Sequence, residues 1–516
     1  MTTRTGGIIW LLIGGVVGCW MLLMPPGAGP DEHSHLVRSG AVVRADFDSA
    51  RTYELPDSYR VPEPGCYAFD ATIAASCTAW PATTGATVPF ASRAGDYPVW
   101  GHAVYGFASL APGLAPLWWA RVIGAASAVG LVGWALRATI GSRPLATTAV
   151  LVGLTPMAWS VFAAVNPSSF VTAGAIALWV GLLSGAAPPN VRIDWLVAIG
   201  WAALVLPRRD GLIWACLTAV IALAATDRSA IEWWRSITFG ARAVIVISTL
   251  ATVAWGVTSD SRTSQMVVVA PLIVVAAETV RWWSARPGTT RCNSLIGFGG
   301  LAAVGMAGLV VLMSRRPGGW DTDLAVDVVA QTDENLIEAI GVLGWLDTVV
   351  PWFAVFTWLV LIGVLVAVAL LSGLRSLAWA SLLAATTVVT SWVFELYQGN
   401  SSGTYWQGRY SIPLLIGIPL LLTLDTSRLA ETAHGLLRRV DALVGAGALL
   451  ILNIAAWATA RRFGVGTDGS HLPWRWGLEI QPIPPLIVLI AHAALTIALL
   501  AVVLAERPRS VVAADR

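Results

Sequence analysis

Apolar runs of membrane-spanning length recur along almost the whole chain and leave few alternatives for its fold. The core of a bilayer has no water to hydrogen-bond the backbone, so only helices or closed barrels cross it. Only 12% of the residues are charged, about half the share in soluble domains. We predict an all-α fold, a polytopic transmembrane helical bundle, although most runs are shorter than the ~20 residues of a full span. The fourteen or so expected spans are residues 8–24, 117–136, 145–165, 170–183, 195–206, 212–225, 243–257, 266–280, 295–313, 352–371, 377–394, 412–424, 443–457 and 486–504.

The arginines predict which side of the membrane each connection faces. All 32 basic residues are arginine, and cytoplasmic loops carry an excess of basic residues. If the first span is an uncleaved anchor that starts inside, 17 arginines fall in inner segments, so both termini are predicted to be cytoplasmic. The expected organisation is a first transmembrane helix (1–24), an extracytoplasmic loop with an acidic motif (25–98), transmembrane helices (99–313), an extracytoplasmic loop with an interfacial helix (314–351), transmembrane helices with outer loops 395–413 and 460–485 (352–505), and a cytoplasmic tail (506–516).

Charge and composition narrow the class of partner. The net charge of +2 gives no reason to expect a nucleic-acid partner. The short inner loops contain no nucleotide-binding motif, so the chain has no evident means of using ATP or a nucleotide-sugar. The absence of lysine, with heavy use of Ala, Gly, Val and Trp, suggests an actinobacterial source. We therefore expect a protein of the bacterial cytoplasmic membrane whose chemistry takes place on the outer face.

Two acids and two histidines follow the first span directly, in Asp31-Glu32-His33-Ser34-His35. Acids are favoured in the first turn of a helix, so helix capping on a solvated loop is one interpretation. The other is a catalytic carboxylate that deprotonates an acceptor hydroxyl or holds a divalent cation. Any metal would bind through Asp31 or Glu32, because no second Glu-x-x-His is present. His33 and His35 stay undecided between a supporting role and solvent.

Arginines at the outer membrane boundary form a second group of candidates. Arg409 lies where topology does not require arginine, and its bidentate fork suits a lipid phosphate; the alternative is snorkelling to a headgroup. Gln407 and Tyr410 flank it as candidate substrate-binding residues. Arg208 and Arg209 share a tight outer turn. They either bind phosphate or pair with an acid and headgroups.

Other polar residues have more structural interpretations. Cys66 and Cys77 are expected to form a disulfide, because the outer side is oxidising. Arg121 lies within a span, where an arginine is costly unless it is paired or hydrated. Residues 323–343 fit an interfacial amphipathic helix. His102 could join the outer cluster, but an ordinary loop role is favoured.

Several of these motifs together resemble a large bacterial membrane-protein family long catalogued only as a domain of unknown function, itself distantly similar to the GT-C glycosyltransferases. The resemblance runs from the first span to about Leu424. In chain order its motifs are Pro25-Pro26, Pro30-Asp31-Glu32, His35, Gly344-Trp345-Leu346-Asp347, Gln407-Gly408-Arg409-Tyr410 and Pro413.

The resemblance implies a GT-C-like enzyme that moves a sugar from a polyprenyl-phosphate carrier to an extracytoplasmic glycan or glycolipid of the cell envelope, with inversion. Carried over by position, Asp31 is the catalytic carboxylate, Glu32 its partner, and Arg409 binds the carrier phosphate. Family context suggests arabinofuranose as the sugar. The rival hypotheses are a transporter or flippase of a lipid-linked or anionic substrate, and a non-catalytic scaffold. Polar residues concentrated at the outer edge, rather than at mid-membrane, favour the enzyme.

Overall fold

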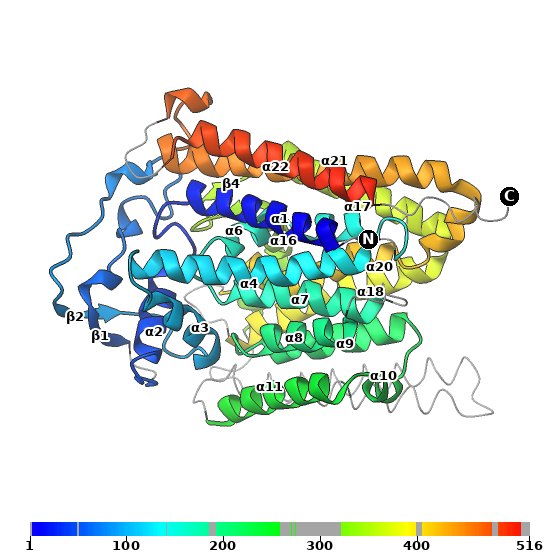
Figure 1. The fold of residues 1–516 in the computed structure, drawn as a ribbon, viewed down its shortest axis with the longest axis horizontal. Helices are drawn as coiled ribbons and strands as arrows, with labels where there is room; N and C mark the ends of the chain where they lie inside the picture. Colours follow the sequence, from blue (N-terminus) through cyan, green and yellow to red (C-terminus); the bar gives the residue numbers. More distant parts are fainter. Residues whose placement is uncertain are drawn as a thin grey trace.

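The computed structural model describes residues 3–48, 51–140, 142–184, 192–258, 270, 274, 321–398, 405–476 and 483–506. These form a bundle of long helices with two short antiparallel strand pairs (Figure 1). The elements are α1 (Thr3–Leu23), α2 (Glu32–Val42), β1 (Thr52–Pro56), η1 (Asp57–Tyr59), η2 (Pro64–Cys66), η3 (Ala75–Cys77), β2 (Thr87–Ala91), α3 (Val99–Ser109), α4 (Pro116–Thr139), α5 (Ala146–Gly153), α6 (Pro156–Phe162), α7 (Ser168–Leu183), α8 (Ile193–Val205), α9 (Gly211–Ala225), α10 (Ala230–Ser236), α11 (Phe239–Thr258), α15 (Thr322–Ala330), α16 (Thr332–Gly341), β3 (Val342–Leu343), β4 (Thr348–Val349), α17 (Trp352–Ser372), α18 (Leu374–Gln398), η5 (Gly408–Ser411), α19 (Ile412–Leu415), α20 (Gly417–Leu422), α21 (Thr426–Val465), η6 (Pro473–Arg475) and α22 (Pro485–Ala505).

The polytopic helical fold is confirmed, but fourteen spans are not. In the described part of the chain, eight helical segments are long and apolar enough to cross a membrane, or nine if α9 and α10, bent by 97°, form one span. They are Gly6–Leu23, Pro116–Thr139, Phe239–Thr258, Trp352–Ser372, Leu374–Tyr397, Gly408–Ala430, Thr432–Val465 and Pro485–Ala505. The described residues include almost none of the expected spans 266–280 and 295–313. They also exclude residues 314–320, 399–404 and 507–516.

Breaks inside apolar runs explain part of the difference. The expected span 145–165 divides into α5 and α6, because Pro156 starts a new helix and cannot continue the old one. The break is buried, and Thr155 there donates its hydroxyl to the Ala339 carbonyl at 2.7 Å. Helices α7 and α8 have only 16 and 13 residues. Hydropathy alone does not distinguish such short interior helices from full spans.

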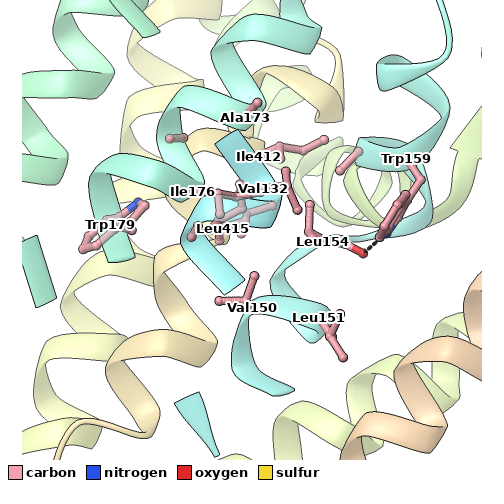
Figure 2. Close-up of a cluster of buried hydrophobic side chains, with 14 of the residues drawn as sticks. Val132, Val150, Leu151, Leu154, Trp159, Ala173, Ile176, Trp179, Ile412 and Leu415 are labelled. Atoms are coloured by element: carbon pink, nitrogen blue, oxygen red, sulfur yellow. Dashed lines mark hydrogen bonds between the residues drawn. The ribbon is translucent and has the colours of Figure 1, made fainter. Parts of the chain in front are cut away.

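The core of the bundle is centred on α7. Every residue of α7 is buried, as expected for a helix that is apolar on all sides, and it packs against α4, α8 and α9. Figure 2 shows side chains of α4, α5, α6, α7 and α19 meeting in one cluster, including Val132, Val150, Ile176 and Leu415. This apolar centre leaves the polar residues at the ends of the helices.

The long first loop folds into a compact unit, here called the cap, made of α2, β1, β2 and η1–η3. Strand β1 pairs antiparallel with β2, with Thr52 opposite Ala91, and Cys66 and Cys77 are joined by a disulfide. Helix α3 follows the cap in the chain and packs against α2 and α4. Figure 1 places β1, β2, α2 and α3 together at the end of the bundle where α1 ends. The cap therefore covers one end of the bundle.

Two further segments of the described chain are also helical. The expected interfacial helix at 323–343 is two helices, α15 and α16, followed by β3. Residues 425–441 continue into the long helix α21, whose backbone is non-helical at Ala433. Helix α21 packs against α17 and α22, and α1 packs against α22. These helices lie in the upper part of Figure 1, away from α11.

Candidate functional site

A cavity of about 1250 Å³ lies between the cap and the ends of the helices. It brings together the start of α2, the turn before α9, the segment between β3 and β4, and the residues leading into η5. Four stretches singled out in the sequence therefore line the same cavity. The residues that line it and matter most are Asp31, His33, His35, Tyr97, Arg208, Arg209, Trp345, Gln407, Arg409 and Tyr410.

Asp31 occupies the N-cap position of α2 but does not cap it. Its backbone is left-handed, with φ of 54°, and its side chain makes no capping hydrogen bond. The side chain is 37% exposed, and its Oδ2 lies 3.6 Å from Nη2 of Arg409, which is too long for a hydrogen bond. The carboxylate thus faces the cavity and keeps its oxygens available for a ligand.

Glu32, the next residue, is in the opposite situation. It is fully buried and is not among the residues that line the cavity. Arg121 binds it with both arms of its fork, at 2.7 and 2.6 Å, and the backbone amides of Gly27 and Val165 donate to it at 3.0 Å each. Both carboxylate oxygens are therefore fully used. This ion pair, here called the Glu32 clamp, also accounts for an arginine within a membrane span.

Arg121 fixes the route of the chain out of the first span. Its guanidinium donates to the carbonyl oxygens of Met24 and Pro25 at 2.8 and 2.9 Å. These carbonyls directly follow α1, and that of Pro25 also accepts from the amide of Ala28 at 3.0 Å. The Glu32 clamp therefore ties α4 to the end of α1 and to the start of the cap. Its geometry is that of structural support.

Arg409 differs because its hydrogen-bonding capacity is only partly used. The residue is 4% exposed, and Nη2 contacts the Tyr410 hydroxyl at 3.3 Å. Its Nε and Nη1 atoms are buried and have no hydrogen-bond partner among the described residues. Buried donors without partners are costly, and a guanidinium in this state is suited to bind an oxyanion.

The backbone around Arg409 is fixed by α16. The Gly408 amide donates to Glu338 at 2.7 Å, and a Cβ at Gly408 would overlap the backbone of Asn335 and Ala339. Glycine is therefore required for this close approach. Burial raises the pKa of the Glu338 carboxyl, which weakens it as a counterion for Arg409. The Gln407 side chain adds a buried Oε1 that has no partner in the described part of the chain.

The other two candidate arginines, Arg208 and Arg209, lie against the rings of Tyr97 and Tyr410. Arg208 forms two hydrogen bonds with Asp210, at 2.9 and 3.2 Å, so the predicted alternative of pairing with an acid is present. Its guanidinium lies 4.3 Å from the centre of the Tyr410 ring, and that of Arg209 lies 5.4 Å from the Tyr97 ring. Arg208, Arg209 and Arg409 are here called the arginine cluster.

The histidines separate into two environments. His33 stacks on Trp345, with ring centres 5.9 Å apart. His35 is buried, meets the Tyr97 ring edge-on at 5.1 Å, and shares a 3.1 Å hydrogen bond with His102. Burial lowers the pKa of His35 well below its ordinary value, and lowers that of His102 to about 4. Both imidazoles are therefore neutral at pH 7, and His102 is a buried residue of α3 that contacts the cavity residue His35 rather than an ordinary loop residue.

A second buried ion pair was not predicted from the sequence. Asp347 and Arg462 lie 2.7 Å apart, and Arg462 also donates to the carbonyls of Tyr67 and Ile73 in the cap at 2.7 and 2.6 Å. The amide of Phe69 donates to Asp347 at 3.2 Å. This pair, here called the Asp347 clamp, ties α21 to the cap. The only sequence signal for it was the acid that ends the Gly-Trp-Leu-Asp motif.

The described residues do not fit a divalent-cation site. No group of three or more His, Cys, Asp or Glu side chains comes together within the described ranges. The charged neighbour of Asp31 is a cation, and Glu32 has no oxygen to spare. Oxygen-rich coordination of the kind that Mg²⁺ or Ca²⁺ needs is therefore not assembled by these side chains.

Comparisons with known proteins address the family. Residues 14–418 match the family described as "Predicted membrane protein (DUF2142)". No curated protein sequence matches the chain. Two solved structures of ArnT from Cupriavidus metallidurans, one bound to undecaprenyl phosphate and one in the apo state, are similar at 15% identity. They cover 97% and 98% of this chain and 77% of ArnT, with TM-scores of 0.37 and 0.35. The chain belongs to the DUF2142 family of predicted membrane proteins.

Proposed function

We propose that this membrane protein is a glycosyltransferase that moves a sugar from a polyprenyl-phosphate carrier to an acceptor hydroxyl outside the cytoplasmic membrane. One observation carries the proposal. Arg409 is buried with two donors unused, at the wall of a large cavity and within ion-pair distance of the accessible carboxylate of Asp31. The sequence resemblance to GT-C enzymes supports the same reaction class.

The phosphate end of the carrier is assigned to Arg409. Its residue precedes the apolar helices α19 and α20, within the candidate span Gly408–Ala430, so a ligand of this guanidinium lies at the membrane boundary. A lipid phosphate can accept from Nε or from Nη1, which lie on different edges of the guanidinium. Negative charge grows on that phosphate as the sugar leaves, and a preorganised cation in a buried site stabilises such charge strongly. Arg209, in the turn before α9, also lines the cavity and adds positive potential there.

The catalytic base is assigned to Asp31. In the reaction, the acceptor oxygen forms a bond to the anomeric carbon, the bond from that carbon to the phosphate oxygen breaks, and the hydroxyl proton moves to Asp31. Attack opposite the departing phosphate inverts the anomeric centre. A positioned carboxylate contributes about 10²- to 10⁴-fold to such a step. Glu32 is assigned to structural support instead of catalysis, because its oxygens are saturated.

The acceptor is assigned to the cap side of the cavity. Phe69 lies there with 73% of its surface exposed and a left-handed backbone, φ 66°, and it meets Trp345 edge-on at 5.5 Å. The Asp347 clamp holds its amide. Exposed aromatic rings kept in place this firmly suit the apolar faces of sugar rings. An extracytoplasmic glycan or glycolipid of the cell envelope is the proposed acceptor, and arabinofuranose remains the proposed sugar.

The test is transfer by purified protein. Polyprenyl phosphates carrying arabinofuranose, mannose or glucose would be mixed with envelope glycan and glycolipid acceptors, and both the glycosylated product and the released carrier would be measured. We expect transfer by the wild type and by the control Arg192→Ala, whose arginine is exposed and remote. Asp31→Asn should lose transfer. If no donor is consumed, but vesicles containing the protein move the intact lipid across the bilayer, the protein is a flippase instead.

A further inference from the structure

His35 of the cavity wall and the buried His102 of α3 form a hydrogen-bond chain that determines where their protons lie. Nδ1 of His102 is 3.2 Å from the carbonyl oxygen of Pro98, and Nε2 of His102 is 3.1 Å from Nδ1 of His35. A carbonyl oxygen only accepts, so Nδ1 of His102 carries a proton. A neutral imidazole carries one proton, so Nε2 of His102 accepts and Nδ1 of His35 donates. Nε2 of His35 is therefore left with a lone pair.

The chain holds because both rings are neutral. Burial lowers the pKa of both imidazoles. The positive groups that act on His35 come from two elements, Arg208 in the turn before α9 and Arg409 in η5, and His33 and His102 would add to them only if protonated. All of them disfavour a proton on Nε2. A buried imidazole in this state is a poor general base but a well-fixed hydrogen-bond acceptor.

The position of His35 indicates which part of a ligand it meets. His35 lines the cavity, and no described residue donates a hydrogen bond to its Nε2. Its ring packs edge-on against Tyr97, and the guanidinium groups of Arg208 and Arg209 lie 5.8 and 5.4 Å from the centre of that tyrosine. Tyr97 thus contacts both His35 and two members of the arginine cluster. Phosphate oxygens cannot donate to a lone pair, whereas hydroxyl groups can.

We propose that Nε2 of His35 accepts a hydrogen bond from a hydroxyl group of the carrier-linked sugar, and that His102 is a positioning residue that holds His35 in the required tautomer. The inference rests on the proposed function, because it assigns the arginine cluster to the carrier phosphate. It divides donor recognition into two parts. Arginine binds the phosphate of any polyprenyl carrier, and His35 recognises the sugar attached to it.

Equilibrium binding separates these parts without requiring catalysis. Full-length protein in detergent would be titrated with bare polyprenyl phosphate and with polyprenyl phosphates carrying arabinofuranose, mannose or glucose. We expect the wild type to bind at least one sugar-bearing carrier more tightly than the bare one. His35→Phe, which keeps a ring beside Tyr97, should lose that preference, a change of roughly 3- to 10-fold for one neutral hydrogen bond. Its affinity for bare carrier should not change.

His102 supplies the matched pair of variants. His102→Leu removes the acceptor for Nδ1 of His35 and should abolish the sugar preference, whereas His102→Gln offers an amide oxygen and should retain it. Equal weakening of bare and sugar-bearing carrier in His35→Phe, or no preference for any sugar in the wild type, would overturn the role of His35 and leave the phosphate site intact. A wild type that binds neither lipid would overturn the proposed function itself.

Discussion

Adjacent carboxylates in this protein have opposite surroundings. In the Glu32 clamp, the carboxylate is fully buried and takes four hydrogen bonds. In the cavity, Asp31 is partly exposed and only approaches its arginine, at 3.6 Å, while that arginine keeps two buried nitrogens unpaired. Each place brings together one carboxylate and one arginine. The degree to which hydrogen-bonding capacity is used distinguishes structural support from a site that awaits a ligand.

The Asp347 clamp extends the comparison to the other side of the cap. Arg462 binds Asp347 and two cap carbonyls, much as Arg121 binds Glu32 and the carbonyls at the end of α1. The cap is therefore tied to α4 by one buried pair and to α21 by the other. The cavity with its unused donors and acceptors is lined in part by this anchored cap.

The largest effect is expected from breaking the Glu32 clamp. Arg121→Met leaves a buried carboxylate uncompensated and should lower the free energy of unfolding by about 3–5 kcal/mol. The matched control is Arg192→Met, whose partner is Asp194 and whose side chain is 62% exposed. It should cost no more than about 1 kcal/mol. Thermal unfolding of the two variants in one detergent measures the difference, and equal stability would remove the structural role of the clamp.

The next largest effect is a loss of transfer activity, which should distinguish Asp31 from Glu32. Asp31→Asn should lower transfer by about 10²- to 10⁴-fold with an unfolding temperature near that of the wild type. Glu32→Gln should do the reverse, lowering the unfolding temperature while the folded fraction keeps its specific activity. Rates would be normalised to folded protein counted by monodisperse elution. A stable but inactive Glu32→Gln would return Glu32 to catalysis.

Much of the fold could be predicted from the apolar runs, and the errors have physical causes. Hydropathy reports that a segment avoids water, but not whether its neighbours are lipid or protein. The wholly buried α7 and the break at Pro156 therefore resemble ordinary spans in the sequence. Boundaries were better where a proline or a polar residue marks the end of a helix, as at Pro116 and Pro485.

The site was predictable where a local motif carries it and not where distant segments meet. Asp31 and Arg409 were singled out and lie together. The separation of Asp31 from Glu32 was not visible, because it depends on the left-handed backbone at Asp31. The partnerships of His35 with His102 and of Asp347 with Arg462 join residues 67 and 115 positions apart. No periodicity or spacing in a single sequence indicates such contacts.

A smaller effect is expected from Arg409→Lys, which tests whether the unused donors of the Arg409 guanidinium bind the carrier phosphate directly. Lysine keeps the charge but does not offer donors fixed in a guanidinium plane. Loss of one charge-assisted hydrogen bond, about 1.5–3 kcal/mol, should raise the KM for the lipid-linked donor roughly 10- to 100-fold. We expect stability to change little, because Arg409 makes few bonds within the protein. An unchanged KM would show that charge alone suffices at this position.

The smallest effect is the dependence of folding stability on pH that comes from the neutral imidazoles. The two clamps contain no histidine. Burial lowers the pKa of His102 to about 4, whereas an unfolded histidine titrates near 6.5. The unfolded chain therefore binds more protons between these values. Stability should be greatest above pH 6.5 and should fall as pH decreases toward 4. Between pH 7 and pH 5 the loss from His102 is about 2 kcal/mol.

The wild type and His102→Gln would be unfolded thermally at pH 7, 6 and 5 in the same detergent, so that titration of other groups cancels in the difference. The variant keeps an acceptor for His35 but has no group that titrates at position 102. Its unfolding temperature should therefore fall less steeply with decreasing pH. Parallel curves would mean that His102 becomes protonated without cost in the folded protein, and the hydrogen-bond chain from Pro98 to His35 would not hold in the form described.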